Sequence, residues 1–189
     1  TSYLPAVPSL CLGTAEISLF EMTGAYSTFA NSGIYMEPYF VSRIEDKNGV
    51  VIETFTKSPK EILSEDKNIV MVKLLQGVIN RGSGSRLRWK YKMNNEIAGK
   101  TGTTQNHSDG WFIGFVPDLV TGVWTGADNR AVRFRDLKLG QGAQMALPIW
   151  GEYMNSVYSD SLIELSKARF EIPKNSNNRN HEPVSYTHL

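Results

Sequence analysis

Three β-rich segments follow one another closely in the second half of this chain, and they constrain the fold more than any other feature. They span about residues 97–104, 110–116 and 120–126. The middle segment is apolar at both sets of alternating positions. Its apolar residues are Trp111, Phe112, Ile113, Phe115 and Val116. A strand that is apolar on both sides lies between two layers. The sequence therefore predicts that this strand is sandwiched between layers. The order of helices, sheet and returning helix along the chain indicates that the sheet is antiparallel.

Two helices are predicted before this sheet. Ser18 and Glu21 form a capping-box pair at the start of the first helix, and Gly33 follows its end. The second helix spans residues 65–81 and begins after Ser64, a residue type that favours the cap position. The predicted apolar face of this second helix consists of Val70, Leu74 and Val78.

Other segments complete an α+β (mixed α/β) pattern. Residues 39–56 predict a hairpin, because Asn48-Gly49 is a type I′ turn signal between two β-rich runs. Residues 82–95 predict a basic, solvated connection. A last helix is predicted over residues 142–158, with Pro148 either in its first turn or at a kink. Helices, then a sheet, then a returning helix indicate the α+β class.

Composition limits the function classes. The chain has 189 residues and a net charge of +1, so charge gives no reason to expect nucleic acid or an anionic membrane as partner. One cysteine, Cys11, excludes an internal disulfide, and the histidines are not clustered as a metal site requires. Residues 1–170 are predicted to form one portion of a domain. Residues 171–189 predict a disordered tail whose last residues, VSYTHL, are interpreted as non-native.

The segment AGKTGTT, residues 98–104, carries the chemistry. On a strand, Thr101 and Thr103 share one face while Lys100 and Gly102 share the other. Two hydroxyls, a cation and an exposed backbone N–H suit a substrate carboxylate and a developing oxyanion. Gly102 lets a ligand approach the strand edge. The alternatives are a polar surface turn and a phosphate loop, but a phosphate loop requires glycine where this chain has Asn94.

With these residues in view, the chain resembles the C-terminal half of the transpeptidase domain of class A (bifunctional) penicillin-binding proteins. The resemblance implies the penicillin-binding-protein transpeptidase or serine β-lactamase-like fold, here as a fragment of the domain. Four stretches carry it: PSLCLGTAEISLFEMTGAYSTFANSGIYMEPYF (8–40), LLQGVINRGSG (74–84), IAGKTGTTQNHSDGWFIGFVPDLVTGVWTGAD (97–128) and LGQGAQMALPIWGEYM (139–154).

The resemblance implies a serine acyl-enzyme mechanism and roles for the motif residues. A serine attacks the D-Ala-D-Ala carbonyl of a peptidoglycan stem peptide, and an amine of a second stem peptide takes the acyl group. Lys100 would be a catalytic cation, and Thr101 and Thr103 would hold the substrate carboxylate. The Thr103 N–H would be an oxyanion donor. Gly102 and Thr104 complete the implied substrate-binding residues.

The nucleophile implied by the resemblance is expected upstream of Thr1, with none in this chain. Ser64 begins a Ser-x-x-Lys sequence, but it has a role as a helix cap and is followed by two carboxylates. Ser176-Asn177-Asn178 spells Ser-x-Asn, but after the Lys-Thr-Gly sequence and in the predicted tail. A Ser-His-Asp arrangement with His107 and Asp109 stays open, although both are predicted at a solvated turn.

Three functions follow as expectations. The first is a D,D-transpeptidase that binds stem peptides and β-lactams without a cofactor or metal. The second is a D,D-carboxypeptidase or β-lactamase-like hydrolase, and the third is a non-catalytic binding remnant. The resemblance further implies a parent protein with an N-terminal glycosyltransferase domain and an anchor in the bacterial inner membrane. The catalytic domain would then lie on the periplasmic side, with other cell-wall synthesis proteins as further partners.

Overall fold

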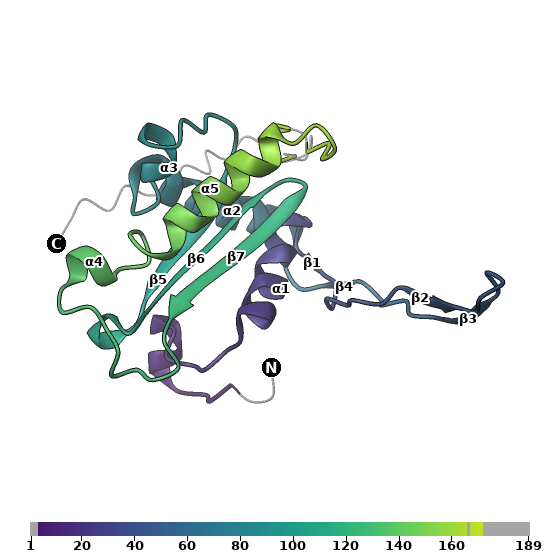
Figure 1. The fold of residues 1–189 in the computed structure, drawn as a ribbon, viewed down its shortest axis with the longest axis horizontal. Coiled ribbons are helices and arrows are strands. Elements are labelled where there is room, and N and C mark those ends of the chain that lie inside the picture. Colours follow the sequence, from purple (N-terminus) through teal and green to yellow (C-terminus); the bar gives the residue numbers. More distant parts are fainter. Residues whose placement is uncertain (1–3, 166, 172–189) are drawn as a thin grey trace.

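The central sheet is antiparallel, as predicted. The computed structural model describes residues 4–165 and 167–171, and within them this sheet has the order β5-β6-β7. β5 is Ala98–Thr103, β6 is Asp109–Val116 and β7 is Leu119–Gly126. Each strand pairs with the next along the chain in continuous register. All three strands lie where the sequence predicts them, and β5 is at an edge of the sheet (Figure 1).

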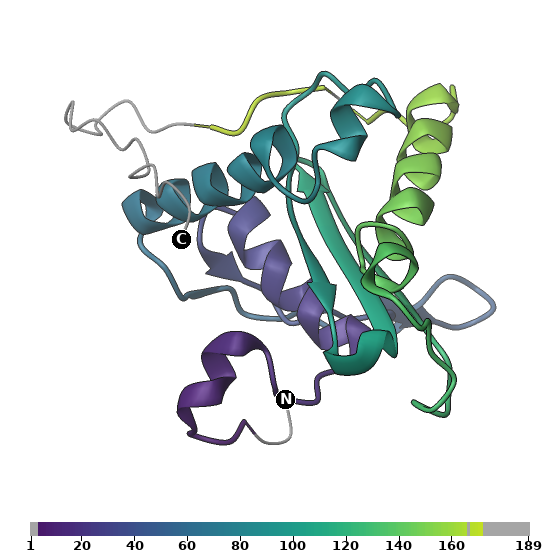
Figure 2. The same cartoon turned by 90° about the vertical axis from the view of Figure 1, so that its left-hand side faces the viewer.

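Helices cover both faces of this sheet. Figure 2 shows α5 (Ala146–Ser159) on one side, and α1 (Leu19–Ala30) and α2 (Glu65–Arg81) on the other. Neighbouring positions of β6 contact different layers. Phe112 packs edge-on against Trp150 of α5, with 5.3 Å between ring centroids, and Phe115 packs against Tyr26 of α1 at 6.4 Å. The predicted burial of the middle strand and the predicted α+β class are therefore confirmed.

Trp150 occupies the centre of the layer between the sheet and α5. Its side chain is fully buried, and its indole N–H donates to the Thr121 carbonyl over 3.1 Å, so its one polar atom is satisfied. Pro148 is the third residue of α5 and lies in the first turn, where its missing N–H costs no helix bond. The other fully buried large side chains are Phe112, Phe115, Ile79, Leu87, Ile97, Leu147, Met154 and Val116.

The predicted capping box starts α1. The Ser18 hydroxyl accepts the Glu21 N–H (3.2 Å), and the Glu21 carboxylate accepts the Ser18 N–H (3.0 Å). The chain reverses at Gly33, where φ is +90° and an added Cβ would overlap the Leu63 carbonyl oxygen. A residue with a side chain does not fit this position, as expected for a predicted stop.

The boundaries of α2 agree with the sequence, but its predicted buried face is wrong. The helix begins after Ser64, whose side chain makes no capping hydrogen bond, and ends at Gly82. Leu74 is 45% exposed, and the buried hydrophobic residues are Ile69, Val72, Leu75 and Ile79. Apolar residues lie on two neighbouring stripes of this helix. Packing against β5 and α1 selects the stripe that the sequence pattern did not favour.

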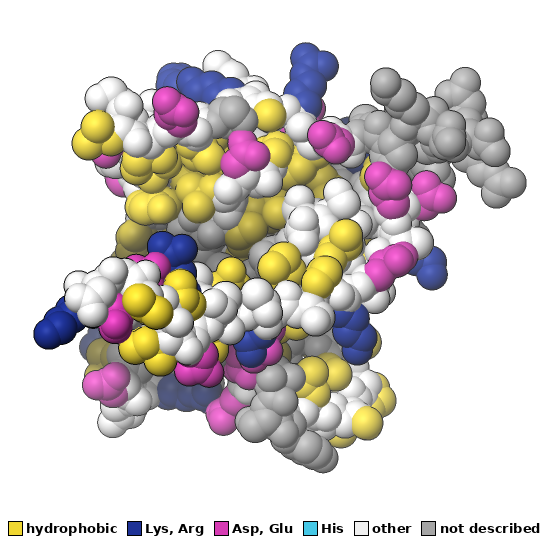
Figure 3. All heavy atoms as spheres, turned by 90° about the vertical axis from the view of Figure 1, so that its right-hand side faces the viewer, with side chains coloured by type: hydrophobic (Ala, Val, Ile, Leu, Met, Phe, Trp, Pro, Cys, Tyr) yellow, Lys and Arg dark blue, Asp and Glu magenta, His cyan; other side chains and the backbone are white. Residues whose placement is uncertain are grey.

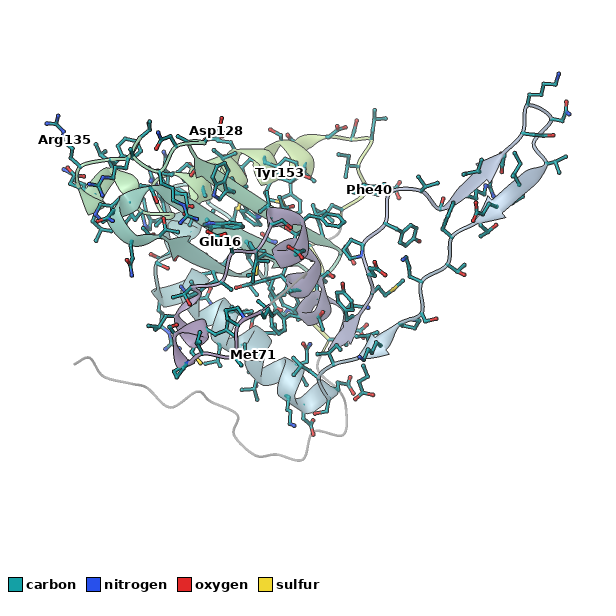
Figure 4. All side chains as sticks on the ribbon, turned by 90° about the horizontal axis from the view of Figure 1, so that it is seen from below. Glu16, Phe40, Met71, Asp128, Arg135 and Tyr153 are labelled. Carbon is teal, nitrogen blue, oxygen red and sulfur yellow. The ribbon has the colours of Figure 1, made fainter. Side chains whose placement is uncertain are left out.

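The predicted hairpin forms an arm that projects from the body (Figure 1). Its strands, β2 (Arg43–Glu45) and β3 (Val51–Thr54), are exposed at every position, and Phe40 at the base of the arm is 88% exposed (Figure 4). The predicted type I′ turn is wrong. That turn requires positive φ at both central residues, whereas within the described hairpin only Gly49 has it. The Asp46 carboxylate instead accepts the N–H groups of Asn48 (2.8 Å) and Val50 (2.9 Å).

An apolar groove of about 350 Å³ opens where the arm joins the body. It lies between α1, β7 and the segment that leads into the arm, and Figure 3 shows hydrophobic side chains around a hollow on this side. Phe20 stacks on Phe40 at 5.1 Å across this junction. A short pairing of β1 (Ile34–Tyr35) with β4 (Lys60–Glu61) joins the arm to the body.

Four short helices were not predicted. They are η1 (Pro8–Leu12), α3 (Arg86–Trp89), η2 (Gln105–His107) and α4 (Leu137–Gly140). The predicted solvated connection at residues 82–95 contains α3 and sends Leu87 fully into the core, so that prediction is wrong. The predicted tail lies outside the described residues from 172 onward. None of the helices that the structure describes is long and apolar enough to cross a membrane.

Candidate active site

The residues predicted to carry the chemistry lie together on β5, at an open edge of the sheet. β6 pairs with one side of β5, and no other described strand pairs with its second side. The Thr104 N–H donates to the Asp109 carbonyl on β6 over 3.3 Å. Because backbone groups alternate in direction along an antiparallel strand, the Thr103 N–H points away from β6. The edge therefore presents an unpaired strand N–H to an incoming ligand.

The side chains of β5 alternate between the two faces. Lys100 lies opposite Ile113, and Thr101 lies opposite Phe112, which faces α5. Lys100 and Gly102 therefore belong to the face covered by α1 and α2, and Thr101 and Thr103 to the face covered by α5. Lys100 is exposed, and its Nζ donates to the Thr101 carbonyl over 2.8 Å. The Lys100 ammonium group therefore lies at the open edge of β5, beside the Thr101 carbonyl.

Both threonine hydroxyls have a partner from a flanking loop. Thr101 Oγ1 lies 2.6 Å from Ser83 Oγ, in the turn between α2 and α3. Thr103 Oγ1 accepts the N–H of Gly142, in the turn between α4 and α5, over 3.0 Å. Sequence reasoning assigned no role to either partner. The available signal was the glycine-rich sequence around each one, in stretches 74–84 and 139–154.

The hydroxyl of Thr104 is occupied within the protein. It lies 2.9 Å from Ser108 Oγ and accepts the Asp109 N–H over 3.2 Å. These contacts close the turn between β5 and β6. The predicted substrate-binding role of Thr104 stays a prediction, and its observed partners are the residues that fix the end of β5.

Ser64 and β5 are far apart. Ser64 precedes the first residue of α2, and Ser83, just beyond the other end of this helix, reaches Thr101. A helix of 17 residues is about 25 Å long. The structure therefore does not bring Ser64 next to Lys100. Ser176 and Asn178 lie outside the described residues.

His107 and Asp109 do not form the open Ser-His-Asp alternative. Asp109 is the first residue of β6 and is only 9% exposed, so the prediction of a solvated turn is wrong for it. Ser108 bonds to Thr104 rather than to His107. Among residues 4–165 and 167–171, no three His, Cys, Asp or Glu side chains are grouped so that they could hold a metal.

Comparison with known families identifies the family of this chain. The family model of the penicillin binding protein transpeptidase domain matches residues 6–130, which include the whole of β5. The chain belongs to this family. The resemblance drawn from the four sequence stretches is thereby confirmed.

Relatives and solved structures extend this result for the transpeptidase domain. Penicillin-binding protein 1A of Aquifex aeolicus is 39% identical over 149 residues, covering 79% of this chain and 20% of the relative. The chain thus spans about a fifth of that protein's length. The crystal structure of penicillin-binding protein 1A from Haemophilus influenzae matches with a TM-score of 0.76 at 24% identity, over 89% of this chain and 30% of the other.

Penicillin-binding protein A from M. tuberculosis, solved as an acyl-enzyme complex with imipenem, matches with a TM-score of 0.55 at 22% identity. This match covers 71% of this chain and 30% of the other. At these identities the solved structures show the shared fold, and they confirm the predicted transpeptidase-type architecture.

Proposed function

We propose that residues 1–170 are the C-terminal portion of a peptidoglycan D,D-transpeptidase domain in a longer, class A-type protein. The observation that carries this proposal is the open edge of β5, where the Lys100 ammonium, two threonine hydroxyls and the outward Thr103 N–H lie within four consecutive residues. The family membership and the relatives named penicillin-binding protein 1A support it. The parent protein in this proposal also carries an N-terminal glycosyltransferase domain, as the resemblance to bifunctional class A penicillin-binding proteins implies.

In the proposed reaction a serine supplied by the upstream part of the domain attacks the penultimate D-Ala carbonyl of a stem peptide. The carbonyl oxygen becomes an oxyanion, and the Thr103 N–H donates a hydrogen bond to it. The C–N bond to the last D-Ala breaks, D-Ala leaves with a proton on its amine, and an acyl-enzyme remains. The amine of a second stem peptide then takes the acyl group and releases the serine.

Lys100 and the threonines have separate roles in this proposal. The positive charge of the Lys100 ammonium favours binding of the substrate carboxylate, and the ammonium supports proton transfer at the nucleophile. The Thr101 and Thr103 hydroxyls donate to the carboxylate of the last D-Ala. Gly102, between them, keeps side-chain bulk away from the edge. β-Lactams carry a similarly placed carboxylate and would acylate the same serine.

The nucleophile in this proposal comes from residues before Thr1. The distance between Ser64 and β5, set by the length of α2, supports this assignment over the local Ser-x-x-Lys sequence. The proposed site of action is the outer face of the bacterial inner membrane, where stem peptides are cross-linked, with the anchor upstream and other cell-wall synthesis proteins as partners.

The test uses the longer protein, extended upstream through the remainder of the domain, and benzylpenicillin. Lys100→Ala should lower the acylation rate by about 100-fold or more, because it removes the cation that faces the carboxylate and the nucleophile. Intact mass spectrometry after timed incubation measures the adduct. Lys47→Ala, at the exposed tip of the arm, is the matched control and should acylate at the unaltered rate.

Two outcomes would contradict the proposal. One is an unchanged acylation rate in a folded Lys100→Ala protein. The other is an adduct on Ser64 in the 189-residue chain alone, which would place the nucleophile in the sequence that the proposal excludes. Release of cross-linked product when an acceptor peptide is added separates transpeptidation from a hydrolase that only cleaves.

A further inference from the structure

We infer that Ser83 and the backbone N–H of Gly142 position the Thr101 and Thr103 hydroxyls so that both donate to an anionic group of the substrate. This inference rests on the proposed function and deepens it. Ser83 and Gly142 come from the turns on either side of the catalytic strand, and each contacts one threonine hydroxyl, over 2.6 Å and 3.0 Å respectively. They are positioning residues, since they act through the threonines.

The direction of the hydrogen bond is fixed at Thr103. A backbone N–H can only donate, so Thr103 Oγ1 is the acceptor and its own proton stays available for another acceptor. The donor is also held in place. Gly142 is buried, an added Cβ would overlap the carbonyl oxygens of Gly102 and Trp111, and its own carbonyl accepts the N–H of Ala146 at the start of α5 (3.0 Å).

At Thr101 the direction follows from the ligand. Either hydroxyl of the Ser83–Thr101 pair can be the donor when the site is empty. When Thr101 donates to a carboxylate, Ser83 must donate to Thr101, because a hydroxyl has one proton. A chain of two hydroxyls that ends on an anion polarises each bond and strengthens it. Ser83 thereby contributes to carboxylate binding without touching the carboxylate.

The turn that carries Ser83 is fixed by backbone bonds. The Gly84 N–H donates to the Val78 carbonyl (3.0 Å), and the Ser85 N–H donates to the Gly82 carbonyl (3.1 Å). The side chain of Ser83 is therefore not needed to form this turn. Ser85 lies two residues further in the same turn, and its side chain makes no capping bond to α3. It provides a matched control for a serine-to-alanine change.

The experiment compares benzylpenicillin with its methyl ester as acylating agents of the longer protein. The ester keeps the reactive ring but lacks the negative charge that the threonines would recognise. Ser83→Ala should slow acylation by benzylpenicillin about tenfold, the value of one hydrogen bond in a charged network, and leave the slower reaction of the ester within about twofold. Ser83→Thr should restore most of the rate, and Ser85→Ala should match the unaltered protein.

Equal losses for the acid and the ester would overturn the inference, because they would show that Ser83 only holds the turn. An unchanged rate with benzylpenicillin in Ser83→Ala would overturn it as well. Measuring Lys100→Ala in parallel distinguishes failure of the positioning role from failure of the proposed function. If Lys100→Ala slows acylation and Ser83→Ala does not, the positioning role alone fails. If Lys100→Ala has no effect, the proposed function fails.

Discussion

Gly142 shows how much one residue without a side chain contributes to this edge of the sheet. Its N–H bonds to Thr103, and its Cα packs where a Cβ would overlap two carbonyl oxygens of neighbouring strands. A side chain at position 142 would have to displace either this turn or the paired strands β5 and β6, to which the two carbonyls belong. The requirement for glycine here is steric.

Gly142→Ala should therefore destabilise the chain by about 1–3 kcal/mol, the usual cost of overpacking a tight site. Gly77→Ala is the matched control. Gly77 lies within α2 with nothing near its missing Cβ, so alanine there should stabilise by about 0.5–1 kcal/mol through helix propensity. Urea unfolding of the three chains, followed by circular dichroism, measures both effects. A neutral Gly142→Ala change would mean that the turn can move away from the sheet.

At the scale of single residues, the sequence predicted the motif on β5 but not the residues that contact its threonine hydroxyls. Lys100, Thr101 and Thr103 are adjacent in the chain, so their shared strand and its alternation follow from local pattern. Ser83 and Gly142 are 18 and 39 residues from the threonines that they contact. Contacts at that separation depend on how α2 and α5 pack, which one sequence does not reveal.

The arm formed by β2 and β3 is the element with the least support from the rest of the protein. Both strands are exposed along their whole length, and an isolated two-stranded hairpin is only marginally stable in water. The Asp46 carboxylate holds the turn by accepting two backbone N–H groups. The hydrogen bond from Val50, which has the larger effect, and the one from Asn48 hold the pKa of this carboxyl below its ordinary value of 3.8.

Because the pKa of Asp46 is lower in the folded state, its stabilisation of the arm is complete above the unfolded-state pKa. This stabilisation is lost as the pH falls from the unfolded-state pKa through the folded-state pKa. We expect the arm to exchange its amide hydrogens faster below about pH 4, relative to the intrinsic exchange rate at each pH. Hydrogen exchange of the peptide that spans residues 42–56 measures this. Asp46→Asn keeps an acceptor without a titratable charge, so its protection should not change over the same pH range. Equal pH dependence in both chains would contradict the role of Asp46.

Prediction of the elements succeeded for the cap of α1 and failed for the buried stripe of α2 and for the turn of the arm. The capping box of α1 involves residues three positions apart, and it was predicted and found. The buried stripe of α2 was wrong because two apolar stripes are available and tertiary packing chooses between them. The turn of the arm was wrong because the Asp46 side chain stabilises a conformation in which Asn48 keeps negative φ.

In the whole molecule, the layer between the sheet and α5 depends on Trp150. Its ring is fully buried against Phe112, and its N–H is bonded to β7, so it connects the helix to two strands. The same helix carries Tyr153, which is 43% exposed and is labelled in Figure 4.

Trp150→Ala should destabilise the chain by about 3–5 kcal/mol, because it leaves a large cavity and removes the hydrogen bond from the indole N–H to the Thr121 carbonyl. Tyr153→Ala removes an aromatic ring from the exposed side of the same helix and should change stability by no more than about 0.5 kcal/mol. Thermal unfolding measures both. Similar losses for the two variants would mean that the helix, rather than the buried ring, determines the stability of this layer.

The overall α+β architecture followed from the sequence because one strand is apolar on both sides and so requires two covering layers. The arrangement of the arm relative to the body did not follow, since every residue of β2 and β3 is exposed. Short helices such as α3 and α4 are too brief to show a period, and burial of Leu87 appears only once α3 is packed.

The projecting arm also offers a practical handle. Its tip at Gly49 has open space around the missing Cβ, and the flanking strands make no contribution to the sheet that carries the motif. Exposed loop tips of this kind tolerate inserted sequence. A short affinity tag or a fluorophore attached at position 48 would stand clear of the body, and would permit immobilisation of the protein with the open edge of β5 left accessible.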